Sequence, residues 1–183
     1  FSGGVNSLDD AYYLGRGLRD DNLYAINTDI AIVDGGSFRA QYYRHTNEGQ
    51  GHWVTPYTPS SPTLPLSLRT TEYTIDRGGI TAGVELPFGI HTISFGLWHE
   101  DSDHNLQRNF YFLNADSPPN RGFFYRNPDV RVFEQDFDSR TRMFYLNDRI
   151  ALMDDRLTID VGFKSLNAEI DAISRRGTRA QGS

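Results

Sequence analysis

The densest group of side chains that could do chemistry lies between His99 and His104, a stretch that holds two imidazoles and three carboxylates. Imidazole nitrogens and carboxylate oxygens are common ligands of divalent cations. The spacing is not that of the helical zinc signature H-E-x-x-H, and no helix is predicted here. We therefore predict a solvated acidic loop at the end of a strand, without a bound metal. His99, Glu100 and His104 are kept as candidates for contact with a ligand.

Aromatic side chains form a second group, concentrated in segments that read as long loops. Flat aromatic faces suit sugars, chelators and apolar ligands. The alternative is that they pack the loops against each other or form a girdle around the molecule. The candidates for ligand binding are Trp53, Tyr57, Tyr111 and Tyr125, and the neighbouring aromatics are Phe112, Phe123 and Phe124.

The sequence lacks the residues or motifs that several classes of chemistry require. The chain has no Cys, which excludes disulfides and thiolate catalysis. No glycine-rich phosphate loop is visible, and no set of acid, base and nucleophile stands out, so we predict neither an enzyme nor a cofactor. The net charge is −6 and no basic stripe is present, so a nucleic-acid partner is not expected.

The elements that must position these side chains are strands. Residues 157–164 alternate without a break, with Leu157, Ile159, Val161 and Phe163 on one side and polar residues on the other. Successive side chains of a strand point to opposite faces, so one face is apolar and the other wet. No apolar run approaches the roughly 18 residues of a membrane helix, but a barrel wall needs apolar residues only at every second position.

The same rhythm predicts about six strands joined as three hairpins. Short turns are expected at 34–36, 87–89 and 153–155, and long loops over residues 1–22, 45–69, 100–129 and 175–183. A long strand is predicted over 130–152, and another begins at Leu157. The apolar positions change from odd to even numbers across Gly78-Gly79, which predicts a β-bulge or a close backbone approach there.

Polar residues of the wet face would line the interior if this sheet closed into a barrel. These expected lumen residues are Asp29, Arg39, Gln41, Glu85, Asp160 and Lys164. One residue opposes the pattern, because Asp148 shares its parity with Phe144 and Leu146 and would face lipid. A bulge that turns it inward, or pairing with Asn147 or Arg149, would resolve the conflict.

A soluble antiparallel sheet also alternates, because one of its faces packs on a core. Strict alternation of short and long connections favours a barrel, since soluble meanders tend to use short connections at both ends. We therefore predict an all-β fold, an antiparallel up-and-down meander of about six long strands. It would be one partial transmembrane β-barrel domain over 1–183, with short periplasmic turns and long extracellular loops.

The stretch from Phe144 to Lys164 resembles TonB-dependent outer-membrane receptors. The family has an aromatic strand with an amide-acid pair, here Asn147-Asp148, then a turn matching Asp155-Arg156-Leu157, then a strand ending near Gly162 and Lys164. The resemblance implies energy-coupled uptake of a bulky solute of the siderophore, vitamin B12 or glycan type across the bacterial outer membrane. It also implies four partners: membrane lipid, the solute, a plug domain and the TonB energy-coupling complex.

The sequence also departs from that family. No plug and no energy-coupling box are found, and six strands cannot close a barrel, since single-chain bacterial barrels begin at about eight. The chain therefore reads as a fragment. Two alternatives remain open, a passive porin-like barrel and a soluble β-sandwich that binds a ligand such as a glycan.

Overall fold

Most of the described chain is β-strand. The computed structural model describes residues 15–32, 35–114, 122–154 and 156–177. The strands are β1 (Gly15–Ala31), β2 (Ser37–Thr55), β3 (Ser67–Phe88), β4 (His91–Phe112), β5 (Val130–Leu152) and β6 (Leu157–Arg176).

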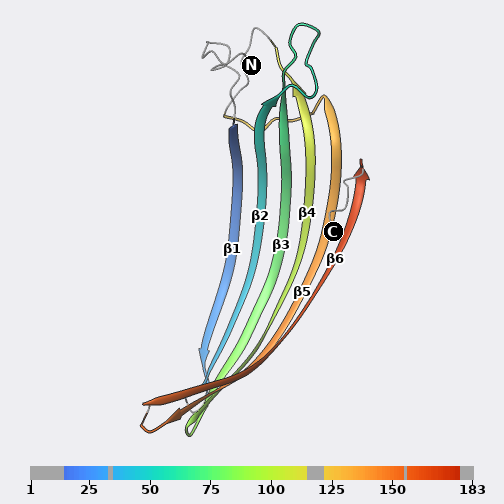
Figure 1. The fold of residues 1–183 in the computed structure, drawn as a ribbon. Helices are drawn as coiled ribbons and strands as arrows, with labels where there is room; N and C mark the ends of the chain where they lie inside the picture. The colour runs from blue at the N-terminus through green and yellow to red at the C-terminus, as the bar shows by residue number, and fades with distance from the viewer. Residues whose placement is uncertain (1–14, 33–34, 115–121, 155, 178–183) are drawn as a thin grey trace.

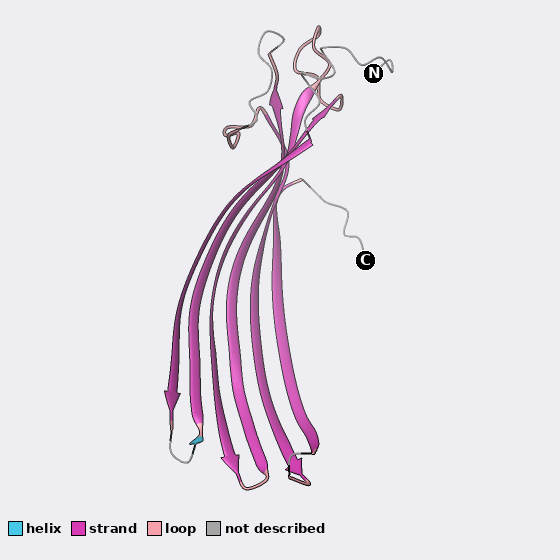
Figure 2. Ribbon diagram, turned by 90° about the vertical axis from the view of Figure 1, so that its left-hand side faces the viewer, coloured by secondary structure: helices cyan, strands magenta, loops and turns pink. Residues whose placement is uncertain are grey.

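The six strands form one antiparallel sheet in the order β1-β2-β3-β4-β5-β6, so every strand pairs with its neighbour in sequence. Figures 1 and 2 show this sheet as a long, curved and twisted wall. The predicted fold, an all-β up-and-down meander of six long strands, is confirmed.

The connections differ at the two ends of the wall (Figure 1). Short turns follow β1, β3 and β5, and we call this the turn end; the longer connections 56–66 and 113–129 lie at the opposite, loop end. Tight hairpin turns require positive φ, which Gly35 (78°), Gly89 (61°), Met153 (55°) and Asp154 (57°) adopt. The predicted alternation of short and long connections is thus confirmed for the connections that the structure describes.

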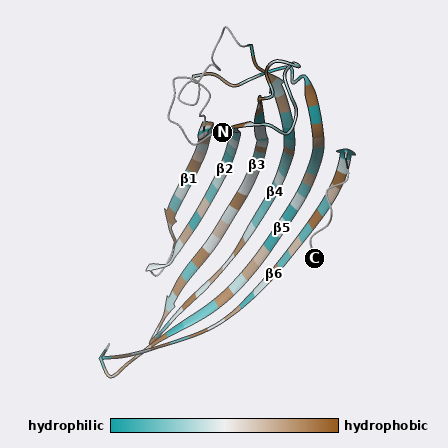
Figure 3. Cartoon of the chain, turned by 45° about the horizontal axis from the view of Figure 1, so that its top comes forward, coloured by the Kyte–Doolittle hydropathy of each residue, from teal (hydrophilic) through white to brown (hydrophobic). Residues whose placement is uncertain are grey.

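The strand register sorts side chains onto two faces. Asp29 lies opposite Arg39, and Ile30 lies opposite Phe38, so neighbouring rows alternate between polar and apolar. We call the side that carries Asp29 and Arg39 the Asp29 face, and the other side, which carries Ile159, the Ile159 face. The alternation appears in Figure 3 as bands of opposite hydropathy along the strands.

The wall is a single layer over most of its length. Ile159, Val161 and Phe163 expose 41%, 60% and 63% of their surface, so no second layer of the described chain covers them. This is not the arrangement of a β-sandwich, in which two sheets bury their inner faces. A small core exists at the loop end, made of Leu64, Leu68, Phe110, Tyr111 and Phe133. Among the described residues, no helix is long and apolar enough to cross a membrane.

Several predicted boundaries are wrong, all in the same direction. The strands run further toward the loop end than expected: β1 begins at Gly15, β2 continues to Thr55, β3 begins at Ser67 and β4 continues to Phe112. In these extensions polar residues occupy both faces, so the alternation that marks a strand in sequence is missing. Cross-strand hydrogen bonds form regardless of side-chain polarity, and they carry the strands onward. The bounds of β5 and the start of β6 are confirmed.

The predicted bulge at Gly78-Gly79 is also wrong. The register of β3 with both neighbours passes these residues without a shift. The expected close approach is present instead: a Cβ at Gly79 would lie 2.6 Å from the Tyr43 hydroxyl and 2.7 Å from the His99 carbonyl oxygen. Glycine therefore makes room for a tyrosine ring, while Ile75 simply lies on the Asp29 face.

Candidate functional site

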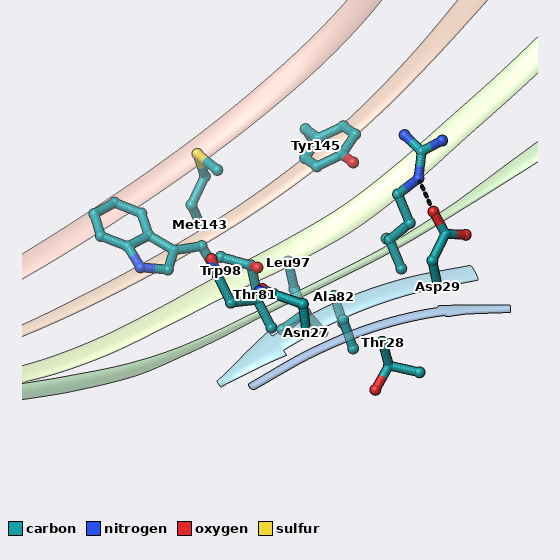
Figure 4. A pocket seen from close by; sticks show the side chains of 13 residues that line it. Asn27, Thr28, Asp29, Thr81, Ala82, Leu97, Trp98, Met143 and Tyr145 are labelled. Carbon is teal, nitrogen blue, oxygen red and sulfur yellow. Dashed lines mark hydrogen bonds and ion pairs between the residues drawn. The ribbon is translucent and has the colours of Figure 1, made fainter. Parts of the chain in front are cut away.

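The Asp29 face is hollowed near the turn end of β1 to β5. A cavity of about 470 Å³ lies there, and two of its lining residues are hydrogen-bonded to each other, since Arg39 Nε donates to Asp29 Oδ2 at 3.2 Å. Figure 4 shows Trp98, Met143 and Tyr145 on the side of the cavity opposite to Asp29. The side chains or backbone that line it include Asn27, Asp29, Arg39, Gln41, Thr81, Gly83, Trp98, Met143 and Tyr145.

Bare backbone forms part of this hollow. A Cβ at Gly96 would meet the Tyr145 ring at 2.6 Å, and a Cβ at Gly83 would lie 2.8 Å from the Tyr145 hydroxyl. The tyrosine therefore lies across two neighbouring strands on the Asp29 face. Glycines covered by an aromatic ring are a recurrent device in curved sheets, because the ring replaces the packing that glycine lacks.

The six residues predicted to line a lumen all have the parity of the Asp29 face. Asp160 accepts hydrogen bonds from Arg149 Nε (3.1 Å) and Asn147 Nδ2 (3.4 Å). Glu85 lies opposite Ser37 and Ser94, and Lys164 lies opposite Tyr145. Asp29, Arg39 and Gln41 are brought together in the cavity, whereas Glu85, Asp160 and Lys164 are spread along the same face. Their role as lumen residues stays a prediction.

The residues from His99 to His104 do not gather into one site. They lie within β4 rather than in a loop, so successive side chains alternate between the faces, and the predicted loop position is wrong. His99 lies on the Ile159 face, 3.0 Å from Asp101 Oδ2. His104 lies on the Asp29 face, with ring centroids 6.3 Å from Tyr73 and 5.6 Å from Phe137. The described residues contain no group of ligating side chains that could hold a metal ion.

Glu100 belongs to a different network, which the sequence did not predict. Trp98 Nε1 donates to the Tyr43 hydroxyl oxygen at 2.9 Å, and the Tyr43 hydroxyl donates to Glu100 Oε2. The carboxylate is thereby held on the Asp29 face, toward the loop end from the cavity. Ligand contact by His99, Glu100 and His104 stays a prediction.

A buried polar cluster lies at the loop end, on the Ile159 face. The Gln50 amide bonds both backbone groups of Tyr125: its Nε2 donates to the carbonyl oxygen at 3.0 Å, and its Oε1 accepts from the amide N–H at 2.7 Å. Arg126 forms a two-pronged ion pair with Glu48, in which Nη2 and Oε2 lie 3.0 Å apart. Residues 122–129, which we call the docked segment, are thus attached to the Ile159 face of β2 and β3.

The same cluster brings together two of the predicted aromatic residues. The rings of Tyr111 and Tyr125 lie 5.1 Å apart, and the Tyr111 hydroxyl lies 2.8 Å from Glu72 Oε1. Burial and the nearby Glu72 carboxylate raise the pKa of Tyr111 above its ordinary value. The His52 ring is fully buried and donates from Nε2 to Gln50 Oε1 at 2.7 Å. Burial lowers the pKa of His52, so this ring is held neutral.

The other two predicted aromatics lie apart from that cluster. Trp53, in β2, has the parity of the Asp29 face, and Tyr57 follows in the connection 56–66. The guanidinium carbon of Arg69 lies 5.5 Å from the Trp53 ring centroid and 5.8 Å from that of Tyr57. Arg69 was missed in the sequence, because only the β2–β3 register places it opposite Trp53.

Asp148 lies on the apolar Ile159 face, as its parity predicts. The two predicted resolutions of this conflict, a bulge and pairing with Asn147 or Arg149, are both wrong. No register shift occurs near it, while Asn147 and Arg149 bind Asp160 on the other face. Its partner is His91, whose Nδ1 lies 2.8 Å from Asp148 Oδ2. Because β5 ends at Leu152, this pair lies close to the turn end.

Comparison with known proteins gives a likeness in fold. No protein-family model matches the sequence, and no curated protein sequence matches it. A solved structure that is similar is BauA, the ferric preacinetobactin receptor from Acinetobacter baumannii, with a TM-score of 0.54 and 15% sequence identity. The match covers 84% of this chain and 25% of the receptor chain, so this chain spans about a quarter of that receptor's length.

Proposed function

We propose that this chain forms part of the barrel wall of a TonB-dependent receptor in the bacterial outer membrane. The receptor would take up a bulky solute of the siderophore, vitamin B12 or glycan type. The observation that supports this most directly is a curved, single-layer wall with an uncovered apolar face. The fold likeness to a ferric siderophore receptor favours this class over a passive barrel.

The apolar residues of the Ile159 face form a band beside the turn end. Bands of this kind face the hydrocarbon of a bilayer, which tilted strands cross in about 9 to 11 residues. In order along the wall the band contains Ile26, Ile30, Phe38, Tyr42, Ile80, Val84, Phe95, Leu97, Phe144, Leu146, Ile159 and Phe163.

The same face becomes charged beyond that band. Asp76, Asp101 and Asp138 follow on β3, β4 and β5 toward the loop end, and Arg140 Nε donates to Asp101 at 2.9 Å. Hydrocarbon excludes such groups, so the wall leaves the bilayer there and continues into water. A strand of 22 residues, such as β3, extends about 70 Å, more than twice the roughly 30 Å hydrocarbon core.

This arrangement gives each face a role. The Ile159 face contacts lipid, and the Asp29 face lines the lumen, where a plug domain would lie against its polar residues. Long connections at the outer end meet the solute, and short turns face the periplasm, where the TonB complex supplies energy. No catalytic step is part of this proposal.

The test uses the full-length gene product in its own host. We expect it in the outer-membrane fraction, with heat-dependent migration on gels, as folded barrels show. Cells that lack the protein should lose uptake of one iron chelate, cobamide or glycan from a panel, and so should cells that lack the TonB complex. Uptake that persists without that complex would indicate a passive barrel, and recovery of the protein in the aqueous fraction would refute the assignment.

A further inference from the structure

Arg69 lies at the loop end of β3, on the Asp29 face, and its guanidinium group is close to two aromatic rings. Its guanidinium carbon lies 5.5 Å from the Trp53 centroid and 5.8 Å from the Tyr57 centroid. A guanidinium over an aromatic face is held by cation–π attraction while its N–H groups remain able to donate. The rings therefore orient the cation without neutralising it.

The charge of Arg69 is not met by a carboxylate of the described chain. No ion pair involves Arg69, and its Nε is buried without a hydrogen-bond partner. A buried, unpaired donor is costly, so its presence points to a partner outside the described part of the chain. Eight of the other described arginines are paired with a carboxylate, namely Arg19, Arg39, Arg44, Arg126, Arg131, Arg140, Arg149 and Arg175.

The surroundings of Arg69 on this face add a second cation and more aromatic surface. Arg108, two positions from the residue opposite Arg69, lies with its guanidinium carbon 5.3 Å from the Phe133 ring centroid. The residues opposite Arg69 in the register are Trp53 and Phe110. The strand positions around this patch carry no acidic residue on the Asp29 face, although the chain as a whole has a net charge of −6.

At the loop end, near Arg69, the two faces of the wall differ in whether another part of the chain covers them. On the Ile159 face the docked segment covers the rows around Gln50 and Glu72. On the Asp29 face Trp53 and Tyr57 expose 48% and 71% of their surface. The aromatic rings beside Arg69 are therefore open to a ligand that enters at the loop end.

We propose that Arg69, Trp53 and Tyr57 form a binding site for a carboxylate carried on a flat ring. The guanidinium would donate to the carboxylate oxygens, and the ring would lie against the exposed indole or phenol. The inference rests on the proposed function only in that the imported solute would be the source of this group. The binding itself depends on these three side chains.

The test is a ¹⁹F NMR titration of the full-length protein in detergent micelles with 4-(trifluoromethyl)benzoate. We expect saturable binding, weakened about tenfold by Arg69→Gln, because a charge-assisted hydrogen bond is lost. Arg69→Lys should bind with an affinity between these two. Trp53→Ala should weaken binding about threefold through lost cation–π attraction and contact area.

Two matched controls isolate the site. Arg142→Gln removes an exposed arginine of the Ile159 face, which has no ion pair with another described residue, and it should leave the affinity unchanged. The neutral probe 4-(trifluoromethyl)benzyl alcohol should bind about tenfold more weakly than the benzoate. The site would be overturned if the benzoate and the benzyl alcohol bind with equal affinity. It would also be overturned if the folded Arg69→Gln and Arg69→Lys variants bind the benzoate as tightly as the wild type does.

The result can be separated from the proposed function. Binding in micelles needs neither a membrane nor the TonB complex. Benzoate binding that depends on Arg69, in a protein that imports nothing, would uphold the site and refute the receptor. If the protein shows energy-coupled uptake but its benzoate binding does not depend on Arg69, the receptor assignment is upheld and the site is refuted.

Discussion

At the scale of single residues, the wall depends on close contacts between a few polar or aromatic groups and their neighbours across the strands. His91 accompanies Asp148 on the Ile159 face, and the carboxylate has one buried oxygen, Oδ1, without a hydrogen-bond partner. Tyr43, Tyr73 and Tyr145 each occupy space that a glycine leaves free. Both features predict strong coupling between specific pairs.

We expect His91→Ala to destabilise the full-length protein by about 1 kcal/mol, because it leaves the Asp148 carboxylate without a partner on the face that the proposed function places against lipid. In the Asp148→Asn background the same change should cost less, since a neutral amide is easier to desolvate. Urea unfolding in lipid vesicles of the four variants gives the coupling energy. A coupling of zero would mean that the pair makes no contribution to stability.

Gly49 offers a second test of coupling. All three of the nearest atoms to a Cβ there belong to Tyr73, at 2.1–2.4 Å, so Gly49→Ala must displace that ring. We expect a loss of about 1–3 kcal/mol, the usual range for overpacking. Adding Tyr73→Ala should remove much of the loss caused by the alanine. If the double variant is as unstable as the sum of the single ones, the ring and the glycine are independent.

At the scale of elements, the docked segment is held against the wall by side chains of β2. The Gln50 side chain forms hydrogen bonds with both the backbone N–H and the carbonyl oxygen of Tyr125, as a neighbouring strand would. Glu48 forms an ion pair with the next residue, Arg126. A single side-chain amide thus holds a loop where no neighbouring strand is available.

Gln50→Ala should release this segment and speed cleavage by trypsin after Arg126. Release exposes the peptide bond and weakens the hold on the Arg126 side chain. Limited proteolysis followed by mass spectrometry measures the rate at this site. Gln41→Ala, which changes the same residue type on the Asp29 face, is the control, and an equal rate in both variants would show that Gln50 does not hold the segment.

The buried His52 makes the same cluster sensitive to pH. Burial lowers its pKa in the folded state, although Glu72 acts in the opposite direction and Arg16 assists. The unfolded region therefore binds more protons, and stability is lost as the pH falls from about 6.5 toward the folded pKa. Exchange of the Tyr125 amide hydrogen, corrected for intrinsic rate, should quicken over that range. His52→Gln should flatten the profile, and an unchanged slope would contradict this origin.

At the scale of the whole molecule, the wall has two environments along its length. Near the turn end its faces differ sharply in polarity, while near the loop end both faces carry polar groups and a loop covers one of them. The fold likeness to the BauA receptor extends over 84% of this chain, so it concerns most of the wall rather than a single hairpin.

The face assignment predicts an asymmetry between two residues of β6 that lie on opposite faces. Val161→Arg, on the Ile159 face, should cost about 2–4 kcal/mol in the folding of the full-length protein into lipid vesicles. Thr158→Arg, on the Asp29 face, should cost far less, because the proposed function places this face in a water-filled lumen. Denaturant titration in vesicles measures both. Equal costs would show that the Ile159 face does not meet hydrocarbon.

The sequence by itself determined the strands near the turn end, the two faces and the sites of the hairpin turns. Alternation with a period of two and glycine-rich turns are local signals, readable when one face is apolar, as from Leu157 to Phe163. The sequence also identified Tyr111 and Tyr125 as candidates for ligand binding, but it did not show that their rings are in contact. Only the tertiary structure decided that β2, β3 and β4 extend to the loop end, because polar faces hide the period of a strand.

Partnerships were likewise decided by the tertiary structure alone. His91 with Asp148, Gln50 with Tyr125, and Arg69 with Trp53 join residues far apart in the chain. Their pairing follows from the register between strands, and long connections such as 56–66 and 113–129 leave that register undetermined in the sequence. The ladders of hydrogen bonds between neighbouring strands fix this register, and they form only when the strands assemble into the wall.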